Sequence, residues 1–511
     1  MAEAGTDYDL LVIGGGINGT GVARDAAGRG LSVLLVEKND LAAATSSWSS
    51  KLIHGGLRYL EQYQFRLVAE ALAEREILLH IAPHLVKPLR FVMPHVPQLR
   101  PRWIIRAGLF LYDHLGHRAV AAGPRETALE PSRAVELRQS PFGSGLRADY
   151  AQGYVYSDCQ VDDARLVLAN ALSATECGAS ILTRTECIDG RRRGDAWELR
   201  LRTAEGSAMM VSARAVVNAA GPWVKAVLDG CLHQASRDGL RLVKGSHIVV
   251  PRAYPGEHAY ILQNDDRRVV FLIPYLQRFT LIGTTDIPVD DIAEPPAASP
   301  TEVDYLCRAA NRYLEQPIAA GDVIWSYAGI RPLYDDGHRN PSTVTRDYTL
   351  RVTTETGAAP LLSVFGGKIT TYRRLAEHVL EQLKPWFRHM GPSWTAGPPL
   401  PGGDSISAAA TSPWQDLHAD LLDALRGRHG SRVAHLLLNV AAPADMGRYF
   451  GAQLYAREID YMIEHEWARS ADDILYRRSK AGLMMNEDER TQVRAYVAAR
   501  LGTATAKELV R

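Results

Sequence analysis

Short apolar runs and a glycine-rich turn organise the beginning of the chain. Residues 8–13 (YDLLVI) and 31–37 (LSVLLVE) are apolar runs of strand length. Residues 22–30 (VARDAAGRG), between them, have a helical pattern that ends at a glycine. Apolar strands on both sides of a helix are typical of a parallel sheet with covered faces. The sequence therefore predicts a βαβ opening and an α/β fold.

The pattern changes further along the chain. Four extended runs separated by short polar turns follow one another at residues 240–250, 258–264, 267–275 and 278–286. They predict an antiparallel meander. An amphipathic helix is expected at about 65–81. Residues 395–404 (TAGPPLPGGD) predict a linker, and the composition after it, rich in Ala, Leu, Arg and Glu, predicts a helical C-terminal domain.

Composition and charge exclude several classes of function. The 511 residues contain 58 Lys plus Arg and 58 Asp plus Glu, so no basic excess supports nucleic-acid binding. The five cysteines are widely spread without a C-x-x-C pair, so no metal site is expected. The N-terminus lacks the pattern of a signal peptide, and no apolar run reaches the ~18 residues of a spanning helix. We therefore expect a cytoplasmic chain, or one that lies on a membrane without crossing it.

A dinucleotide-binding fingerprint follows the first predicted strand. Gly14, Gly16 and Gly19 have the spacing G-x-G-x-x-G, and Glu37 ends the next strand at about the distance expected of a ribose-binding acid. Glycines let the backbone approach a pyrophosphate, whose negative charge the helix N-terminus stabilises. Glu37 would accept hydrogen bonds from the ribose hydroxyls. A glycine turn in an unrelated α/β fold is the alternative interpretation.

The segment after Glu37 favours FAD over a nicotinamide cofactor. A nicotinamide enzyme would continue with further βα units, whereas residues 45–59 (TSSWSSKLIHGGLRY) combine hydroxyls, glycines and cations. That composition suits a loop around a large polar ligand. A solvated serine-rich loop is the alternative.

Eight motifs then follow in a specific order: GGGINGTG, TSSWSSKLIHGGLRYLE, VYSDCQVDDARLVLAN, NAAGPW, KGSHIVVP, GTTD, GIRPL and SVFGGKITTYRRLAE. In this order and spacing they resemble the respiratory FAD-dependent sn-glycerol-3-phosphate dehydrogenases. The resemblance extends from about Tyr8 into the C-terminal helices. It implies a glutathione-reductase-type FAD-binding Rossmann domain, an antiparallel-sheet substrate domain and a helical C-terminal domain.

The resemblance also implies domain boundaries. The discontinuous FAD-binding domain would comprise residues 1–75, 150–235 and 325–394, and the substrate or cap domain residues 76–149 and 236–324. The linker at 395–404 would then lead to the helical domain at 405–511.

The implied reaction is oxidation of sn-glycerol 3-phosphate at C2 to dihydroxyacetone phosphate. Hydride would pass to N5 of non-covalently bound FAD, and electrons would continue to a membrane quinone. That acceptor implies peripheral association with the inner face of the cytoplasmic membrane, and a homodimer is one option for the assembly. The alternative is an oxygen-dependent oxidase of glycerol 3-phosphate or of an amino acid on the same fold.

Site residues are also carried over from the resemblance. Substrate binding is expected of Arg58, Tyr59, Thr284, Arg331 and Lys368, since an arginine fork bonds two phosphate oxygens at once. His247 is the expected base, with Lys368 and His54 as alternatives, and Arg331 and Lys368 are expected to assist catalysis. The expected FAD contacts are Gly14, Gly16, Gly19, Glu37, Thr45, Ser46, Ser47, Lys51, His54, Gly55, Ala219, Gly221, Gly367, Lys368 and Thr370.

Two features qualify this assignment. Trp48 is bulkier than expected next to a flavin, and Ala220 lacks the hydroxyl that some relatives have in N-A-T-G-P-W.

Residues 98–118 (QLRPRWIIRAGLFLYDHLGHR) predict either a basic amphipathic helix at a membrane interface or a buried helix with a charged edge. In the first case, Trp103 and Phe110 would contact lipid.

Overall fold

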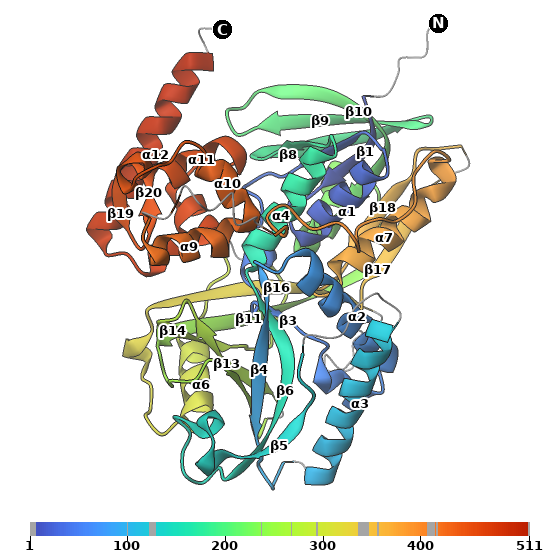
Figure 1. Ribbon diagram of the computed structural model, residues 1–511. Coiled ribbons are helices and arrows are strands. Elements are labelled where there is room, and N and C mark those ends of the chain that lie inside the picture. The colour runs from blue at the N-terminus through green and yellow to red at the C-terminus, as the bar shows by residue number, and fades with distance from the viewer. Residues whose placement is uncertain are drawn as a thin grey trace, which may run out of the picture.

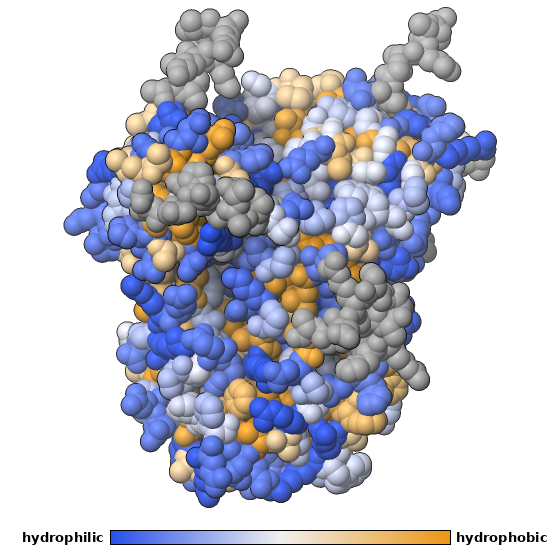
Figure 2. Space-filling model, in the orientation of Figure 1, coloured by the Kyte–Doolittle hydropathy of each residue, from blue (hydrophilic) through white to orange (hydrophobic). Residues whose placement is uncertain are grey.

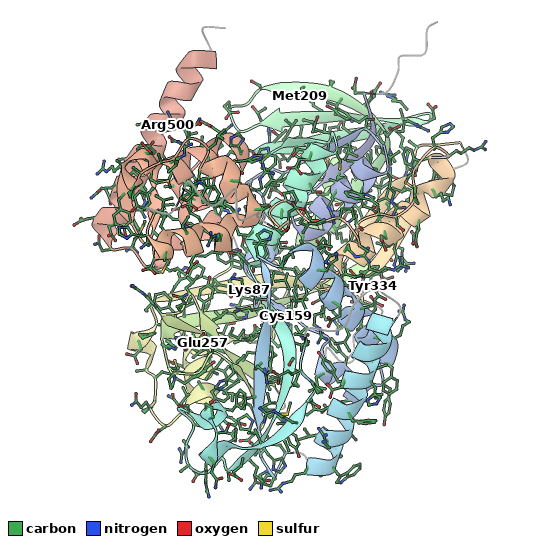
Figure 3. The ribbon with its side chains drawn as sticks, in the orientation of Figure 1. Lys87, Cys159, Met209, Glu257, Tyr334 and Arg500 are labelled. Carbon is green, nitrogen blue, oxygen red and sulfur yellow. The ribbon has the colours of Figure 1, made fainter. Side chains whose placement is uncertain are left out.

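The computed structural model describes most of the chain. The described residues are 7–99, 101–121, 129–236, 238–266, 268–292, 295–335, 347–354, 357–405, 414 and 417–508, without the side chains of 58, 62, 116–121 and 503–508. Two large sheets, A and B, lie one above the other, and a helical C-terminal region packs beside them (Figure 1). Side chains fill the space between these elements (Figure 3).

Sheet A has the predicted parallel core. Its order is β17 (Thr349–Thr353), β18 (Leu361–Phe365), β10 (Ala208–Asn218), β1 (Tyr8–Ile13), β2 (Val33–Val36) and β7 (Ser180–Leu182). All pairs in this order are parallel except that of β17 with β18. The antiparallel strands β8 (Thr185–Arg193) and β9 (Ala196–Thr203) continue from β10. The expected α/β fold is therefore confirmed.

Three helices pack together beside sheet A: α1 (Ile17–Gly28), α4 (Asp163–Glu176) and α7 (Tyr372–Leu383). Strand β1 has the bounds that the apolar run predicts. Helix α1 begins five residues before the predicted segment, at Ile17, because the glycine motif forms its first turn. Tertiary contacts outweigh the low helix propensity of glycine there.

Sheet B contains the predicted meander. Its order is β15 (Ile287–Val289), β11 (Gly239–Pro251), β14 (Phe279–Gly283), β13 (Val269–Tyr275), β12 (Ala259–Gln263), β4 (Val86–Pro94), β6 (Gln152–Val161) and β3 (Leu52–Ile53). Strand β16 (Trp325–Asp335) pairs with β11, and β5 (Arg133–Glu136) pairs with β6. The four predicted runs are strands, and β11 pairs with the last of them, β14, rather than with β12. Strands β3, β6 and β16 thus lie in sheet B, although the boundaries implied by the resemblance place all three in the FAD-binding domain.

Alternate residues of sheet B face two different cores. Ile248 and Val250 pack with α6 (Pro300–Asn311), whereas Val249 between them packs with α2 (Phe65–Ile81) and α3 (Arg102–Ala121). This is the period of two expected of a sheet covered on both faces. Helix α2 has the bounds that the sequence predicts.

The C-terminal region is helical, as predicted. It contains α9 (Ala419–His429), α10 (Val433–Leu436), α11 (Ala456–His465) and α12 (Glu487–Glu508), with a short ribbon of β19 (Tyr449–Gly451) and β20 (Leu454–Tyr455). The predicted linker is not a free tether. The Leu400 N–H donates to the Ile81 carbonyl (2.7 Å), and the buried Arg24 guanidinium donates to the carbonyls of Thr395 and Pro398.

The described helices include none with the length and apolar character needed to cross a membrane. Helix α3 does carry exposed apolar side chains: Trp103 is 72% exposed and Phe110 57%. Apolar and hydrophilic residues are mixed over the lower right of Figure 2, where Figure 1 draws α3.

Candidate active site

A cavity of about 880 Å³ is lined by residues of both sheets. Sheet A contributes Ile13 and Val36, the last residues of β1 and β2, and Ala219, which follows β10. Sheet B contributes side chains of β11 and β16. Ligands of α/β folds bind outside the carboxyl ends of parallel strands, and cavities of this size hold small molecules and cofactors.

The glycine motif forms a tight turn at one side of the cavity. Gly14 has a φ of +114°, and a Cβ there would lie 2.7 Å from the Ala219 carbonyl oxygen. A Cβ on Gly19 would lie 1.9 Å from the Gly14 oxygen, so α1 packs directly on the turn. The N-terminus of α1 has no capping side chain at Gly16, and the Ile17 N–H donates to Ser46 Oγ (3.0 Å). Apart from the Ile17 N–H, the start of the helix is not capped by the Gly16 position and suits an anionic group.

Glu37 lies at the end of β2 and lines the cavity. Its carboxylate accepts hydrogen bonds from the N–H groups of Gly15 (2.7 Å) and Asn39 (2.8 Å). Burial raises the pKa of Glu37. Because a carboxylate has about four acceptor positions, two remain for further donors such as hydroxyls.

Charged and hydroxyl side chains gather at the other end of the cavity, around β11 and β16. The Arg331 guanidinium donates to the Thr285 carbonyl (2.7 Å) and lies 3.0 Å from Asp286 Oδ1. A Cβ on Gly245 would lie 2.6 Å from Arg331 Nη2 and 2.7 Å from Thr284 Oγ1. Glycine at this position therefore lets both side chains line the cavity.

Lys368 is the most unusual cation of the site. Its Nζ lies 4.3 Å from the centre of the Tyr59 ring, is buried, and has no hydrogen-bond partner among the described residues. It follows Gly366 and Gly367, both with positive φ, and the Asn18 side-chain amide donates to the Gly366 carbonyl. A buried ammonium without a hydrogen bond is costly. An anionic ligand in the cavity would offset that cost.

His247 lines the same end of the cavity on β11. Its Nε2 is 2.9 Å from Ser50 Oγ, and its ring stacks on Tyr327 at 4.8 Å between centroids. Burial and the positive charges of Lys51 and Arg331 lower the pKa of His247 to about 3. The imidazole is therefore neutral near pH 7, and it becomes a stronger proton acceptor only when a negative charge binds beside it.

Comparisons with known proteins agree with this geometry. The family model "FAD dependent oxidoreductase" matches residues 9–373, and the model "C-terminal domain of alpha-glycerophosphate oxidase" matches residues 393–507. Glycerol-3-phosphate dehydrogenase of Pseudomonas aeruginosa is 54% identical over 496 residues, which cover 96% of this chain and 95% of the relative. The chain belongs to the FAD-dependent oxidoreductases, in the group of the glycerol-3-phosphate dehydrogenases.

Two further relatives add to the family assignment. The X-ray structure of the glycerol-3-phosphate dehydrogenase from Bacillus halodurans complexed with FAD has a TM-score of 0.72 and 26% identity, and the match covers 98% of this chain and 95% of that one. D-erythritol 1-phosphate dehydrogenase of Brucella abortus is 49% identical over 500 residues, covering 96% of this chain and 97% of the relative. High similarity thus extends to enzymes named for two different polyol phosphates.

FAD is the cofactor of this family member, and the described residues fit it. Gly14 and the start of α1 suit a pyrophosphate, and Glu37 suits the ribose hydroxyls. The buried Lys368 Nζ without a hydrogen bond suits an anionic edge of a ligand. These groups would hold FAD along the cavity.

Most predicted FAD contacts line the cavity, and four do not. Those that line it are Gly14, Gly16, Glu37, Thr45, Ser46, His54, Ala219, Gly221, Gly367, Lys368 and Thr370. Gly19, Ser47, Lys51 and Gly55 lie behind this lining and support it. Ser47 Oγ donates to the Ala42 carbonyl, and Lys51 Nζ pairs with Asp163 (2.8 Å). The predicted substrate residues Tyr59, Thr284, Arg331 and Lys368 line the cavity, whereas the side chain of Arg58 lies outside the described residues.

Sequence reasoning missed several lining residues. Ser50, Asn18 and Asp286 lie inside the motifs TSSWSSK, GGGINGTG and GTTD, which gave the only signal for them. Phe271 had no signal beyond its strand pattern.

Trp48 lines the cavity and packs against Trp325 and Tyr327, with ring centroids 5.7 and 5.4 Å away. Its bulk therefore belongs to an aromatic cluster beside the cofactor site, and Ala220 also lines the cavity.

Proposed function

We propose that the chain oxidises sn-glycerol 3-phosphate at C2 to dihydroxyacetone phosphate and delivers the electrons to a membrane quinone. The observation that carries the proposal is the buried Lys368 Nζ without a hydrogen-bond partner among the described residues, in the same cavity as Arg331 and neutral His247. When bound, FAD supplies the hydride acceptor, N5. The protein supplies charge, orientation and a base.

Each residue has a distinct role in this proposal. Arg331 and Lys368 neutralise the phosphate dianion, and Tyr59 and Thr284 orient the substrate through their hydroxyls. His247 takes up the proton of the C2 hydroxyl as the C2 hydrogen leaves as hydride. The phosphate of the substrate would stabilise the imidazolium that forms, against the burial that otherwise disfavours it.

An anaerobic titration tests the reaction. Addition of sn-glycerol 3-phosphate to the purified yellow protein should bleach the visible flavin absorption, and a soluble quinone should restore it. Glycerol serves as the control that lacks the phosphate, and D-erythritol 1-phosphate as the longer polyol phosphate. If only D-erythritol 1-phosphate bleached the flavin, the proposed substrate would be wrong, but the proposed reaction, oxidation of a polyol phosphate by FAD, would stand. No bleaching by either phosphate would overturn the proposal.

The oxygen-dependent oxidase alternative is not favoured, because the curated relatives with 48–54% identity are dehydrogenases. Amine oxidation also needs no phosphate clamp. The same cuvette separates the alternatives: rapid recovery of the yellow colour in air without quinone would support an oxidase.

We also propose that α3 attaches the protein peripherally to the inner face of the cytoplasmic membrane, where the quinone resides. Ile105, Leu109 and Tyr112 on α3 are buried, whereas Trp103 and Phe110 are exposed. Exposed aromatic residues combined with basic residues are typical of interfacial helices.

Vesicle flotation tests this attachment. Anionic vesicles should carry the wild-type protein upward, and the double variant Trp103→Ser, Phe110→Ser should float less. Met210→Ser on β10 is a matched control, since Met210 is 63% exposed but lies on a different element. Undiminished flotation of the double variant would exclude α3 as the element that binds the membrane. A homodimer stays a prediction.

A further inference from the structure

The proton path from the substrate to His247 can be read from the surroundings of the imidazole ring. His247 Nδ1 is buried and has no hydrogen-bond partner among the described residues. The other ring nitrogen, Nε2, contacts a side chain that lines the cavity. That nitrogen already has a neighbour, Ser50 Oγ at 2.9 Å.

Ser50 is held firmly in this position by its neighbours in the chain. Ser49 Oγ donates to Asp163 (2.7 Å), and Lys51 Nζ pairs with the same carboxylate (2.8 Å). The Tyr327 hydroxyl donates to the Ser49 carbonyl (2.7 Å), while its ring stacks on His247. Tyr327 thus fixes both the serine segment and the imidazole. A hydrogen bond preorganised in this way requires little rearrangement during a reaction.

Ser50 also lies in the right place to meet a ligand. Both Ser50 and His247 line the cavity, but His247 is only 3% exposed whereas Ser50 is half-buried. The serine hydroxyl is therefore the more accessible member of the pair. A hydroxyl both donates and accepts a hydrogen bond, so it is able to accept from the substrate and donate to Nε2 at the same time.

We propose that Ser50 relays the proton between the C2 hydroxyl of the substrate and His247. The O–H bond of the substrate breaks as its proton moves to Ser50 Oγ, and the Ser50 proton moves to His247 Nε2. The relay requires the neutral ring to carry its proton on Nδ1, so that Nε2 accepts. The C2 hydrogen leaves with its electron pair to FAD, so the substrate loses one hydride and one proton and becomes the ketone. This inference rests on the proposed function.

The test compares side chains with and without a hydroxyl in the FAD-loaded protein. We expect Ser50→Ala to lower the rate of anaerobic flavin reduction by about 100-fold, with a nearly unchanged substrate Kd and flavin spectrum. Ser50→Thr should recover most of the rate. If Ser50 only fills space, alanine would instead be tolerated at least as well as the larger threonine.

Two further comparisons keep the outcomes separate. Should Ser50→Ala not retain FAD, Ser50→Thr and Ser50→Val replace it, because these side chains are similar in shape and differ in the hydroxyl. Ser212→Ala is the control, since Ser212 on β10 donates to Asp7 and does not line the cavity. Equal reduction rates with and without the hydroxyl would overturn the relay and leave the proposed function intact. Failure of the wild-type protein to be reduced would overturn the proposed function itself.

Discussion

Two buried polar regions of this protein differ in how their charges are satisfied. Between the C-terminal region and the part of the protein around sheet A, Arg478 pairs with Asp40 in the loop after β2. There Arg165 on α4 pairs with Glu466, which also contacts His429 (3.3 Å). All these side chains are nearly inaccessible. At the substrate end of the cavity, by contrast, Lys368 Nζ and His247 Nδ1 have no hydrogen-bond partner among the described residues.

The difference separates structural charge from functional charge. A buried ion pair neutralises both of its charges within the protein, although the Nε atoms of Arg165 and Arg478 have no hydrogen-bond partner among the described residues, so its loss should appear as instability. Lys368 Nζ contacts the Tyr59 ring but has no hydrogen-bond acceptor among the described residues, so an anionic ligand would complete its interactions. Loss of Lys368 should therefore appear in substrate binding and turnover. The first two predictions test this contrast from opposite sides.

The largest effect is expected at the domain interface. Arg478→Met removes a fully buried guanidinium. The buried Asp40 carboxylate then keeps only Arg477 of its two arginine partners. Breaking a buried pair in this way typically costs about 3–5 kcal/mol. Thermal unfolding of the FAD-loaded protein should show a clearly lower Tm.

Arg500→Met is the matched control, because Arg500 on α12 (labelled in Figure 3) pairs with Asp460 while 42% exposed. Exposed pairs contribute about 0–1 kcal/mol, so this variant should unfold almost as the wild type does. Similar Tm values for the two variants would mean that the buried ion pair stabilises the protein no more than the exposed one.

Lys368→Met should show the opposite behaviour. The substrate loses a charge-assisted hydrogen bond worth about 2–3 kcal/mol, so kcat/KM should fall roughly 30- to 150-fold. The Tm of the apoprotein should change little, since the variant loses the contact with the Tyr59 ring but no longer buries an ammonium without a hydrogen bond. Steady-state kinetics and thermal unfolding on one preparation check both parts. A lower Tm with unchanged kcat/KM would make Lys368 a structural residue.

The same contrast explains what the sequence was able to predict. Strand β1 was predicted to the residue because an apolar run meets Gly14, and both signals are local. Lys51 was expected to contact FAD, yet its carboxylate partner Asp163 lies on α4, far along the chain. The hydrogen bond between Ser50 and His247 likewise joins distant segments. Motifs indicate which residue types are present, whereas the fold decides which of them pair with each other.

A third prediction concerns the cofactor end of the cavity. Glu37→Gln replaces one carboxylate oxygen by an NH₂ group, so bonds from the Gly15 and Asn39 N–H groups compete with the ribose hydroxyls for a single oxygen. We expect the Kd of FAD to rise about tenfold, or about 1.4 kcal/mol. Fluorescence titration of the apoprotein with FAD measures this. Glu198→Gln, at an exposed pair with Arg193, should leave the Kd unchanged; an unchanged Kd in Glu37→Gln as well would exclude Glu37 as a ribose ligand.

The smallest effect is expected from Glu302, a fully satisfied carboxylate behind the substrate end. It accepts hydrogen bonds from Ser246 Oγ (2.7 Å) and Thr285 Oγ1 (2.8 Å) and pairs with Lys244 (2.8 Å). Burial alone would raise its pKa, but the donors from Lys244, Ser299, Ser246 and Thr285 lower it to about 2.

The sign of the pH dependence follows from this lowered pKa. The stabilisation by Glu302 is complete above the unfolded-state pKa of about 4.5 and is lost as the pH falls toward 2. Lowering the pH from 4.5 to 3.5 should therefore remove about 1 kcal/mol of stability. Glu302→Gln, which does not titrate, should have a lower Tm at pH 6 and a flatter dependence of Tm on pH below 4.5. Parallel curves for the two proteins would mean that the charge of Glu302 adds no stability. The carboxylate that binds Thr285, whose carbonyl accepts from Arg331, would then not be needed to hold that end of the cavity together.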